Sequence, residues 1–157
     1  MATSVISLDQ DTIVNQIQVA APPERVFRAL TDANELKRWF SGPDCPAKSW
    51  NMDARVGGHY SYTNEKASVV INGVSEFECH GEILECDPPR LLAYTWIANW
   101  HDNKSARTVV RWELEKKGSG TSVKVTHSGL ASLPVAREDY SGGWPGVVGM
   151  LKKYVEG

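Results

Sequence analysis

The sequence predicts an α+β domain in which one antiparallel sheet of about seven strands packs with two short helices and one long helix. Three observations predict this class. Residues 22–40 carry two short amphipathic helical patterns directly after a strand. From Trp50 onward, short segments of alternating apolar and polar residues are separated by turn residues. The last stretch, residues 134–156, returns to helical spacing over its whole length.

The helix pair in residues 22–40 is the clearest local pattern. Pro22 and Pro23 preset the first helical turn. Asp32 is placed to cap the second helix, with Glu35 three residues on as in a capping box. The apolar faces of the two helices comprise Val26, Phe27 and Leu30, and then Leu36, Trp39 and Phe40. Such a paired apolar face has to pack against another element, which we expect to be the sheet.

Seven strands are expected, all in antiparallel pairs. The first covers residues 12–20 and leads into the helix pair. Residues 41–48 have the composition of a loop. The remaining strands are predicted near residues 48–53, 57–64, 74–86, 90–100, 107–117 and 121–129. Residues 87–90 and 116–120 are typical of tight turns, so the strands on either side of each turn should pair as hairpins.

Alternation along the strands predicts which side chains share a face. The expected sets are Val110, Trp112 and Leu114; Val123, Val125 and His127; Phe77, Cys79 and Ile83; and Tyr94 with Trp96. The strand near 90–100 is apolar on both sides, so the pattern leaves open whether Tyr94 and Trp96 lie on the concave or the outer face.

The terminal stretch presents a conflict between pattern and propensity. Its apolar stripe comprises Tyr140, Trp144, Val147, Val148, Leu151 and Val155, which predicts one helix. However, a helix-interior glycine costs about 1 kcal/mol and a proline about 3 kcal/mol. The stretch contains four such glycines and Pro145. Propensity alone therefore predicts a helix that starts only at Pro145.

Composition limits the class of protein. A chain of 157 residues with 41% apolar content suits a single domain over residues 1–157. Its 17 basic and 19 acidic residues are interspersed, so no nucleic-acid partner is expected. The chain has neither an apolar run of about 20 residues nor a signal-peptide pattern at its start, so we expect no membrane insertion and a cytoplasmic location.

The cysteines and their neighbours predict reduced thiols without a metal. Cys45, Cys79 and Cys86 are odd in number and lack paired spacing. His80 and Glu82 lie close to two of them, but the spacing fits no zinc site and alternation puts Cys79 and His80 on opposite faces. No cofactor of any kind is expected.

Five stretches together resemble a known family. They are APPERVFRALTDANELKRWF, VGGHYSY, HGEILECDPPRLLAYTW, GTSVKVTHSGL and SGGWPGVVGMLKKYVEG. In this order they resemble bacterial members of the family related to the activator of the heat-shock-protein-ninety ATPase, within the START and Bet v-type (SRPBCC) superfamily. The resemblance covers about residues 12–156 and implies the helix-grip (START-like) fold, in which a curved sheet wraps the terminal helix. It also implies that this helix begins before Trp144, and a bend near residues 142–145 would reconcile that start with the helix propensities.

The helix-grip fold implies a cavity between the sheet and the terminal helix, where an apolar small molecule would bind. The expected ligand-binding residues are Trp39, Phe40, Trp144 and Val148, followed by Tyr60, Tyr62, Trp112 and His127. For each aromatic residue the alternative is ordinary core packing.

No catalytic residue is predicted. His127 is in phase with Val123 and Val125, so it is either a hydrogen-bonded core residue or a neutral imidazole available for proton transfer. His59 has the same two interpretations. Neither histidine has a nucleophile near it in the sequence, and no catalytic triad or carboxylate pair follows from the spacing.

Three functions remain as alternatives. The first is non-catalytic binding of a hydrophobic or aromatic small molecule, with a stress-related role suggested by the resemblance. The second is a co-chaperone-like modulator of a heat-shock ATPase, a chaperone contact that the family name alone suggests. The third is a cyclase- or hydrolase-like cavity enzyme. A homodimer is a further expectation if Trp50 and Trp100 expose their rings in loops.

Overall fold

The computed structural model describes residues 4–41 and 45–157. Residues 42–44, within the loop predicted over 41–48, and residues 1–3 lie outside the described part. The strands are β1 Val5–Ile6, β2 Ile13–Val19, β3 Ala47–Met52, β4 His59–Asn64, β5 Glu78–Asp87, β6 Leu91–Ala98, β7 Thr108–Lys117 and β8 Gly120–Ser128. The helices are α1 Pro23–Thr31, α2 Ala33–Trp39 and α3 Pro134–Glu156.

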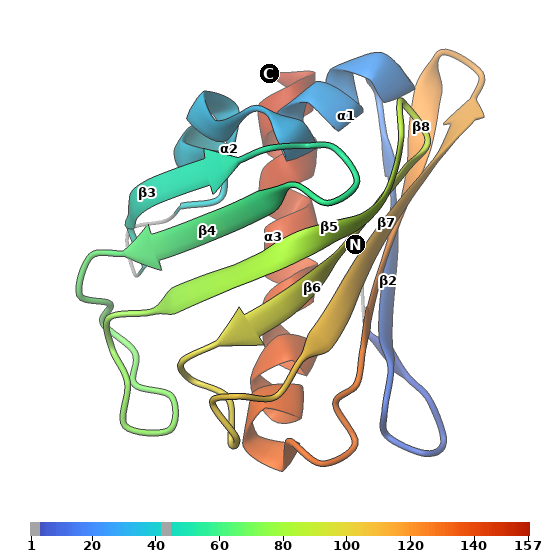
Figure 1. The fold of residues 1–157 in the computed structure, drawn as a ribbon. Helices are drawn as coiled ribbons and strands as arrows, with labels where there is room; N and C mark the ends of the chain where they lie inside the picture. The colour runs from blue at the N-terminus through green and yellow to red at the C-terminus, as the bar shows by residue number, and fades with distance from the viewer. Residues whose placement is uncertain (1–3, 42–44) are drawn as a thin grey trace.

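The described strands form one antiparallel sheet in the order β1-β2-β8-β7-β6-β5-β4-β3. Figure 1 shows α3 lying across one face of this curved sheet, with α1 and α2 over one end of it. α3 packs most closely against β2 and also contacts α1 and α2. The predicted helix-grip architecture is therefore confirmed.

The sheet has one strand more than the sequence predicts. β1 is only two residues long and both of its side chains are exposed, so it offers no alternation by which to recognise it. The strand expected near 74–86 begins at Glu78, because the preceding residues belong to the β4–β5 loop. The turns predicted at 87–90 and 116–120 join β5 to β6 and β7 to β8.

Tertiary contacts explain why α3 continues through Pro145. A proline cannot donate the helix hydrogen bond to the carbonyl four residues earlier, which here belongs to Ser141. The hydroxyl of Ser4 donates to that carbonyl oxygen at 2.6 Å. At the start of α3, the Asp102 carboxylate accepts from the backbone N–H groups of Val135 (3.0 Å) and Ala136 (2.9 Å). The helix therefore begins before Trp144, and the prediction from propensity alone is wrong.

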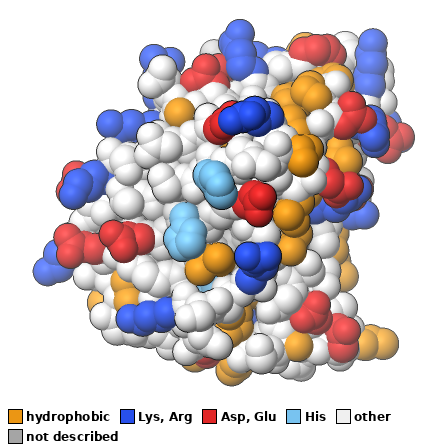
Figure 2. Space-filling model, in the orientation of Figure 1, with side chains coloured by type: hydrophobic (Ala, Val, Ile, Leu, Met, Phe, Trp, Pro, Cys, Tyr) orange, Lys and Arg blue, Asp and Glu red, His pale blue; other side chains and the backbone are white. Residues whose placement is uncertain are grey.

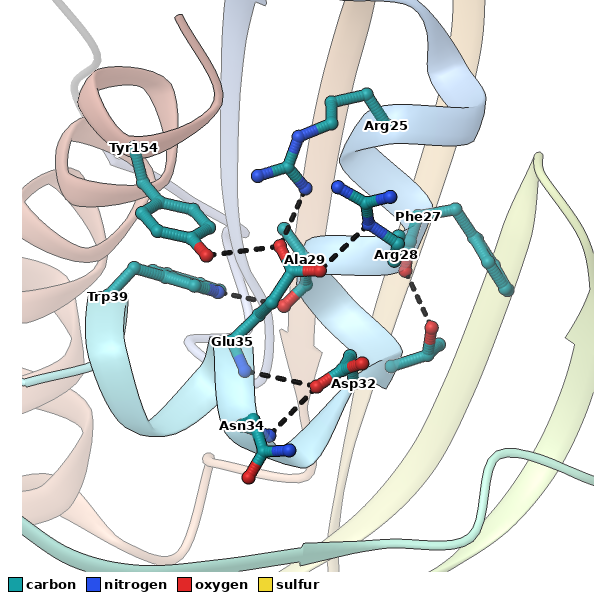
Figure 3. A network of polar contacts seen from close by, with 10 residues as sticks. Arg25, Phe27, Arg28, Ala29, Asp32, Asn34, Glu35, Trp39 and Tyr154 are labelled. Carbon is teal, nitrogen blue, oxygen red and sulfur yellow. Dashed lines mark hydrogen bonds and ion pairs between the residues drawn. The ribbon is translucent and has the colours of Figure 1, made fainter. Parts of the chain in front are cut away.

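A network centred on Glu35 fixes α1, α2 and the end of α3 relative to one another (Figure 3). Glu35 is 8% exposed, and its carboxylate pairs with Arg25 at 2.6 Å and Arg28 at 2.8 Å. Tyr154 of α3 donates to the same carboxylate at 3.1 Å. Asp32 caps α2 as predicted, but Glu35 makes these contacts instead of completing a capping box. The network sets the position of the residues that follow α2.

Register places the core on the concave face of the sheet. Val110 lies opposite His127, Trp112 opposite Val125, and Leu114 opposite Val123, and all six are buried as the alternation predicts. Tyr94 and Trp96 are also buried, and the Trp96 ring lies 6.2 Å from that of Trp144 on α3. The face left undecided by the sequence is therefore the concave one.

Several expectations about exposure change. Trp50 and Trp100 are 7% and 6% exposed, so they do not offer the exposed rings on which the homodimer was based. His59 is exposed and is not a core residue. The three cysteines form no disulfide within the described part. On the outer face of the sheet, acidic and basic side chains are interspersed (Figure 2).

Candidate functional site

A cavity of about 400 Å³ opens between α3, strands β4 and β6, and the loops beside them. Its helix side is formed by Asp139, Tyr140, Gly143, Trp144, Val147 and Met150. Its sheet side is formed by Tyr62, Phe77, Trp96 and Trp100. The lining is completed by Phe40, Ser41 and Cys45 after α2 and by Val69 and Ile71 of the β4–β5 loop. The volume lies within the range typical of small-molecule sites.

Gly143 gives the helix side of the pocket its open shape. Asp139, Gly143 and Val147 are spaced four residues apart, so they follow one face of α3. A Cβ atom added at Gly143 would meet no atom within 4 Å. The backbone of α3 is therefore bare at this point, and a bound molecule can approach it closely.

Aromatic rings cluster around the inner end of the pocket. The ring of Tyr140 lies 6.5 Å from Trp96 and 6.2 Å from Trp100, and Trp100 lies 5.0 Å from Phe77. Beside the end of α2, the rings of Phe40 and Tyr62 meet edge to face at 5.6 Å. These rings present large apolar surfaces with few polar atoms, which favours a ligand with a hydrophobic or aromatic body.

His127 is locked behind this wall in one neutral tautomer. The indole N–H of Trp144 donates to its Nδ1 at 3.1 Å, so the ring proton is on Nε2. Nε2 then donates to the Thr108 hydroxyl at 2.8 Å, and that hydroxyl donates to the carbonyl of Trp96 at 2.7 Å. Burial holds the pKa of His127 well below its ordinary value. Both ring nitrogens are engaged, so His127 positions Trp144.

Tyr140 connects the pocket to a second histidine. Its hydroxyl oxygen accepts from the indole N–H of Trp96 at 2.8 Å and lies 2.7 Å from Nε2 of His101. Burial raises the pKa of Tyr140 and lowers that of His101, so both groups are neutral near pH 7. This arrangement fixes the ring of Tyr140 as part of the pocket wall.

Asp139 is the one carboxylate among the described residues of the pocket wall. It is half-buried, and burial raises the pKa of its carboxyl group to about 6. Within residues 4–41 and 45–157, no hydrogen bond or ion pair to this carboxylate is formed. None of the lining residues that the structure describes is Lys, Arg or His.

The residues predicted to bind a ligand divide into two groups. Phe40, Tyr62 and Trp144 line the pocket. Trp39, Tyr60, Trp112, His127 and Val148 are buried but do not line it. Trp39 donates from its indole N–H to the carbonyl of Ala29, and Tyr60 donates to that of Thr95, both at 2.7 Å. Whether any of the eight contacts a ligand stays a prediction.

Sequence reasoning did not single out several lining residues. Trp96 and Tyr140 were recognised as apolar positions, but their relation to the cavity depends on how closely α3 approaches β6. Asp139 and Gly143 gave no signal, because a carboxylate and a glycine in a helix normally indicate a solvated face and a weak helix. No group of three or more His, Cys, Asp or Glu side chains suited to a metal occurs among the described residues.

The fold and the pocket together define a small helix-grip protein with an internal aromatic cavity. A model of the family described as "Activator of Hsp90 ATPase homolog 1-like protein" matches residues 20–156, and the chain belongs to this family. The resemblance noted in the sequence is thus confirmed. A search of curated proteins found no match.

Solved structures share the fold. Protein CV1439 from Chromobacterium violaceum is 28% identical with a TM-score of 0.77, and the match covers 94% of this chain and 99% of that one. Protein Ms6760 from Mycobacterium smegmatis is 18% identical with a TM-score of 0.77 over 99% and 95%. DynU16, from the dynemicin biosynthetic locus, is 20% identical with a TM-score of 0.71 over 93% and 47%. Among the described helices, none is long and apolar enough to cross a membrane.

Proposed function

We propose that the chain binds a hydrophobic or aromatic small molecule, without transforming it, in the pocket between α3 and the sheet. The observation that carries this proposal is the cavity of about 400 Å³ with aromatic walls and a bare helix surface at Gly143. A ligand bound in an apolar pocket of this size removes its own apolar surface and that of the walls from water, which favours binding. Membership of a helix-grip family supports the same conclusion.

The geometry of His127 favours binding over proton transfer by that residue. Its Nδ1 accepts from Trp144 and its Nε2 donates to Thr108, so a substrate would have to break a buried hydrogen bond to reach either nitrogen. A stress-related or co-chaperone role stays a prediction that rests on the resemblance alone.

The test compares a variant that fills the pocket with one that does not. Gly143 lines the pocket, whereas Gly146 lies one turn away on α3 and does not; both glycines have open space around an added Cβ. Leucine is a better helix former than glycine, so Gly143→Leu and Gly146→Leu should both fold. Binding of naphthalen-1-ylmethanol is measured by calorimetry and by the fluorescence of the tryptophans in the wall.

We expect the wild-type protein and Gly146→Leu to bind this neutral probe equally. Gly143→Leu should bind about tenfold more weakly or worse, which corresponds to about 1.4 kcal/mol. The proposal would be overturned if the wild-type protein bound neither this probe nor a charged analogue of the same shape, or if the two variants weakened binding equally. If the probe binds as expected, native mass spectrometry of the protein purified from its natural host would identify the chemical class of the physiological ligand.

A further inference from the structure

Asp139 differs in chemistry from the other described residues that line the pocket. Among the lining residues within 4–41 and 45–157, the other side chains are aromatic, aliphatic or small, and Asp139 alone brings a carboxylate. A half-buried carboxylate loses hydration, and in proteins this loss is normally offset by a cation or by hydrogen-bond donors. The described residues supply neither, so this role is left to a molecule that enters the pocket.

The sign of the charge restricts what that molecule can be. The described part of the wall holds no Lys, Arg or His, so a ligand carboxylate or phosphate would meet only the negative charge of Asp139 there. A protonated amine would instead form an ion pair in a partly dry site, where such pairs are stronger than in water. The pocket therefore favours a positive group at this position.

The aromatic rings near Asp139 also favour a positively charged ligand. Tyr140 follows it in α3 and lies 6.2 Å from the ring of Trp100 and 6.5 Å from that of Trp96. The faces of tryptophan and tyrosine attract ammonium groups, which adds to the attraction of the carboxylate. Gly143, one turn further along α3, leaves space for the ligand beside Asp139.

We propose, building on the function proposed above, that the pocket selects hydrophobic amines, whose protonated nitrogen pairs with the carboxylate of Asp139 beside the aromatic wall. The apolar body of the amine occupies the space between Trp96, Trp144 and Val147. Asp139 is thus a binding residue that determines the charge of the ligand.

The test uses three probes of one shape and different charge. Naphthalen-1-ylmethylamine is positive, naphthalen-1-ylmethanol is neutral, and 1-naphthoate is negative. Calorimetry at pH 7.5 is performed on the wild-type protein, on Asp139→Asn and on Glu138→Gln. Glu138 is the matched control, because it is the preceding carboxylate on α3 but is exposed and does not line the pocket.

We expect the wild-type protein and Glu138→Gln to bind the amine about tenfold more tightly than the alcohol, which a single ion pair in a partly dry site can supply. The naphthoate should bind most weakly. In Asp139→Asn the amine and the alcohol should bind alike. If the wild-type protein binds the alcohol as tightly as the amine, or if Asp139→Asn keeps the preference, the amine inference is wrong and the proposed function stands. If no probe binds, both are overturned.

A pH series adds a second readout. The pKa of Asp139 is raised to about 6, so its carboxyl is mostly protonated at pH 5 and ionised at pH 7.5. Amine affinity should therefore rise about fivefold over this range in the wild-type protein and stay level in Asp139→Asn. Other titratable or charged groups near this end of the pocket are Cys45, Tyr62, His101, Asp102, Arg137, Glu138 and Tyr140. Their contribution persists in Asp139→Asn, so a pH dependence retained by that variant would contradict the inference.

Discussion

The two sides of α3 treat buried polar groups differently. On the side facing β7 and β8, His127 and Thr108 have hydrogen-bond partners on each functional atom, and the Thr121 hydroxyl donates to the carbonyl of Ala21 at 2.7 Å. On the side facing β4 and β6, the wall includes Asp139, which has no cation beside it in the described part of the chain. The buried indole N–H of Trp100, also on that wall, makes no hydrogen bond of ordinary geometry within the described residues.

This difference separates structural from ligand-directed polar groups. Proteins pair buried polar atoms almost without exception, because each unpaired atom costs about 1–3 kcal/mol. The side of α3 that faces β7 and β8, called the packed side below, follows that rule within the protein. The side that faces β4 and β6, called the open side below, departs from the rule at the cavity wall, where a bound molecule can supply the missing hydrogen-bond partners.

The largest expected effect comes from breaking the packed side. His127→Ala removes a fully buried ring and leaves the indole N–H of Trp144 without an acceptor. We expect it to lower the free energy of unfolding by about 3 kcal/mol or more. Urea denaturation at pH 7 measures this loss. His59→Ala is the control; because His59 is exposed, its effect should stay within about 0.5 kcal/mol. A loss below 1 kcal/mol for His127→Ala would show that its hydrogen bonds do not matter for stability.

The second prediction concerns how the stability cost of His127→Ala depends on pH. Burial holds the pKa of His127 in the folded protein well below the value of about 6.5 expected when unfolded. Between these values the unfolded chain binds the extra proton, so wild-type stability falls as the pH drops below about 6.5. Alanine cannot titrate, so the cost of His127→Ala should be about 2 kcal/mol smaller at pH 5 than at pH 7. A cost that does not change between the two pH values would mean that His127 accepts a proton in the folded state.

The packed side was largely predictable from the sequence, and the reason is periodicity. Alternation identified Val110, Trp112 and Leu114 as one buried row, because each strand buries a single face. The same pattern placed His127 on that face but left its role open, since its partners Trp144 and Thr108 lie on other elements.

The open side was less predictable for a physical reason. A cavity is the space that side chains fail to fill, and this depends on the distance between α3 and β6, which no local pattern encodes. Gly143 counted only as a cost to the helix, whereas in the structure it forms a bare stretch of wall. Val69 and Ile71 line the pocket from the β4–β5 loop, and the path of a loop cannot be predicted from a periodic pattern in the sequence.

The smallest expected effect tests the open side, and it is a gain in stability where His127→Ala gives a loss. Burial raises the pKa of Asp139 from its ordinary 3.8 to about 6, so ionising this group costs stability in the empty protein. Such a shift corresponds to at most about 3 kcal/mol, and partial exposure reduces it to about 1 kcal/mol. Asp139→Asn should therefore stabilise the empty protein by about 1 kcal/mol at pH 7.5.

The pH dependence of this gain is the decisive part of that prediction. An acid whose folded pKa is raised contributes most to stability below its unfolded pKa and loses that contribution as the pH rises through the folded value. The gain from Asp139→Asn should thus be full above about pH 6 and vanish near pH 4, as measured by urea denaturation of ligand-free protein. Glu138→Gln should show no such trend, because Glu138 is exposed. If Asp139→Asn instead destabilises the protein at pH 7.5, the carboxylate already has a partner in the folded chain, and the open side of α3 obeys the same rule as the packed side.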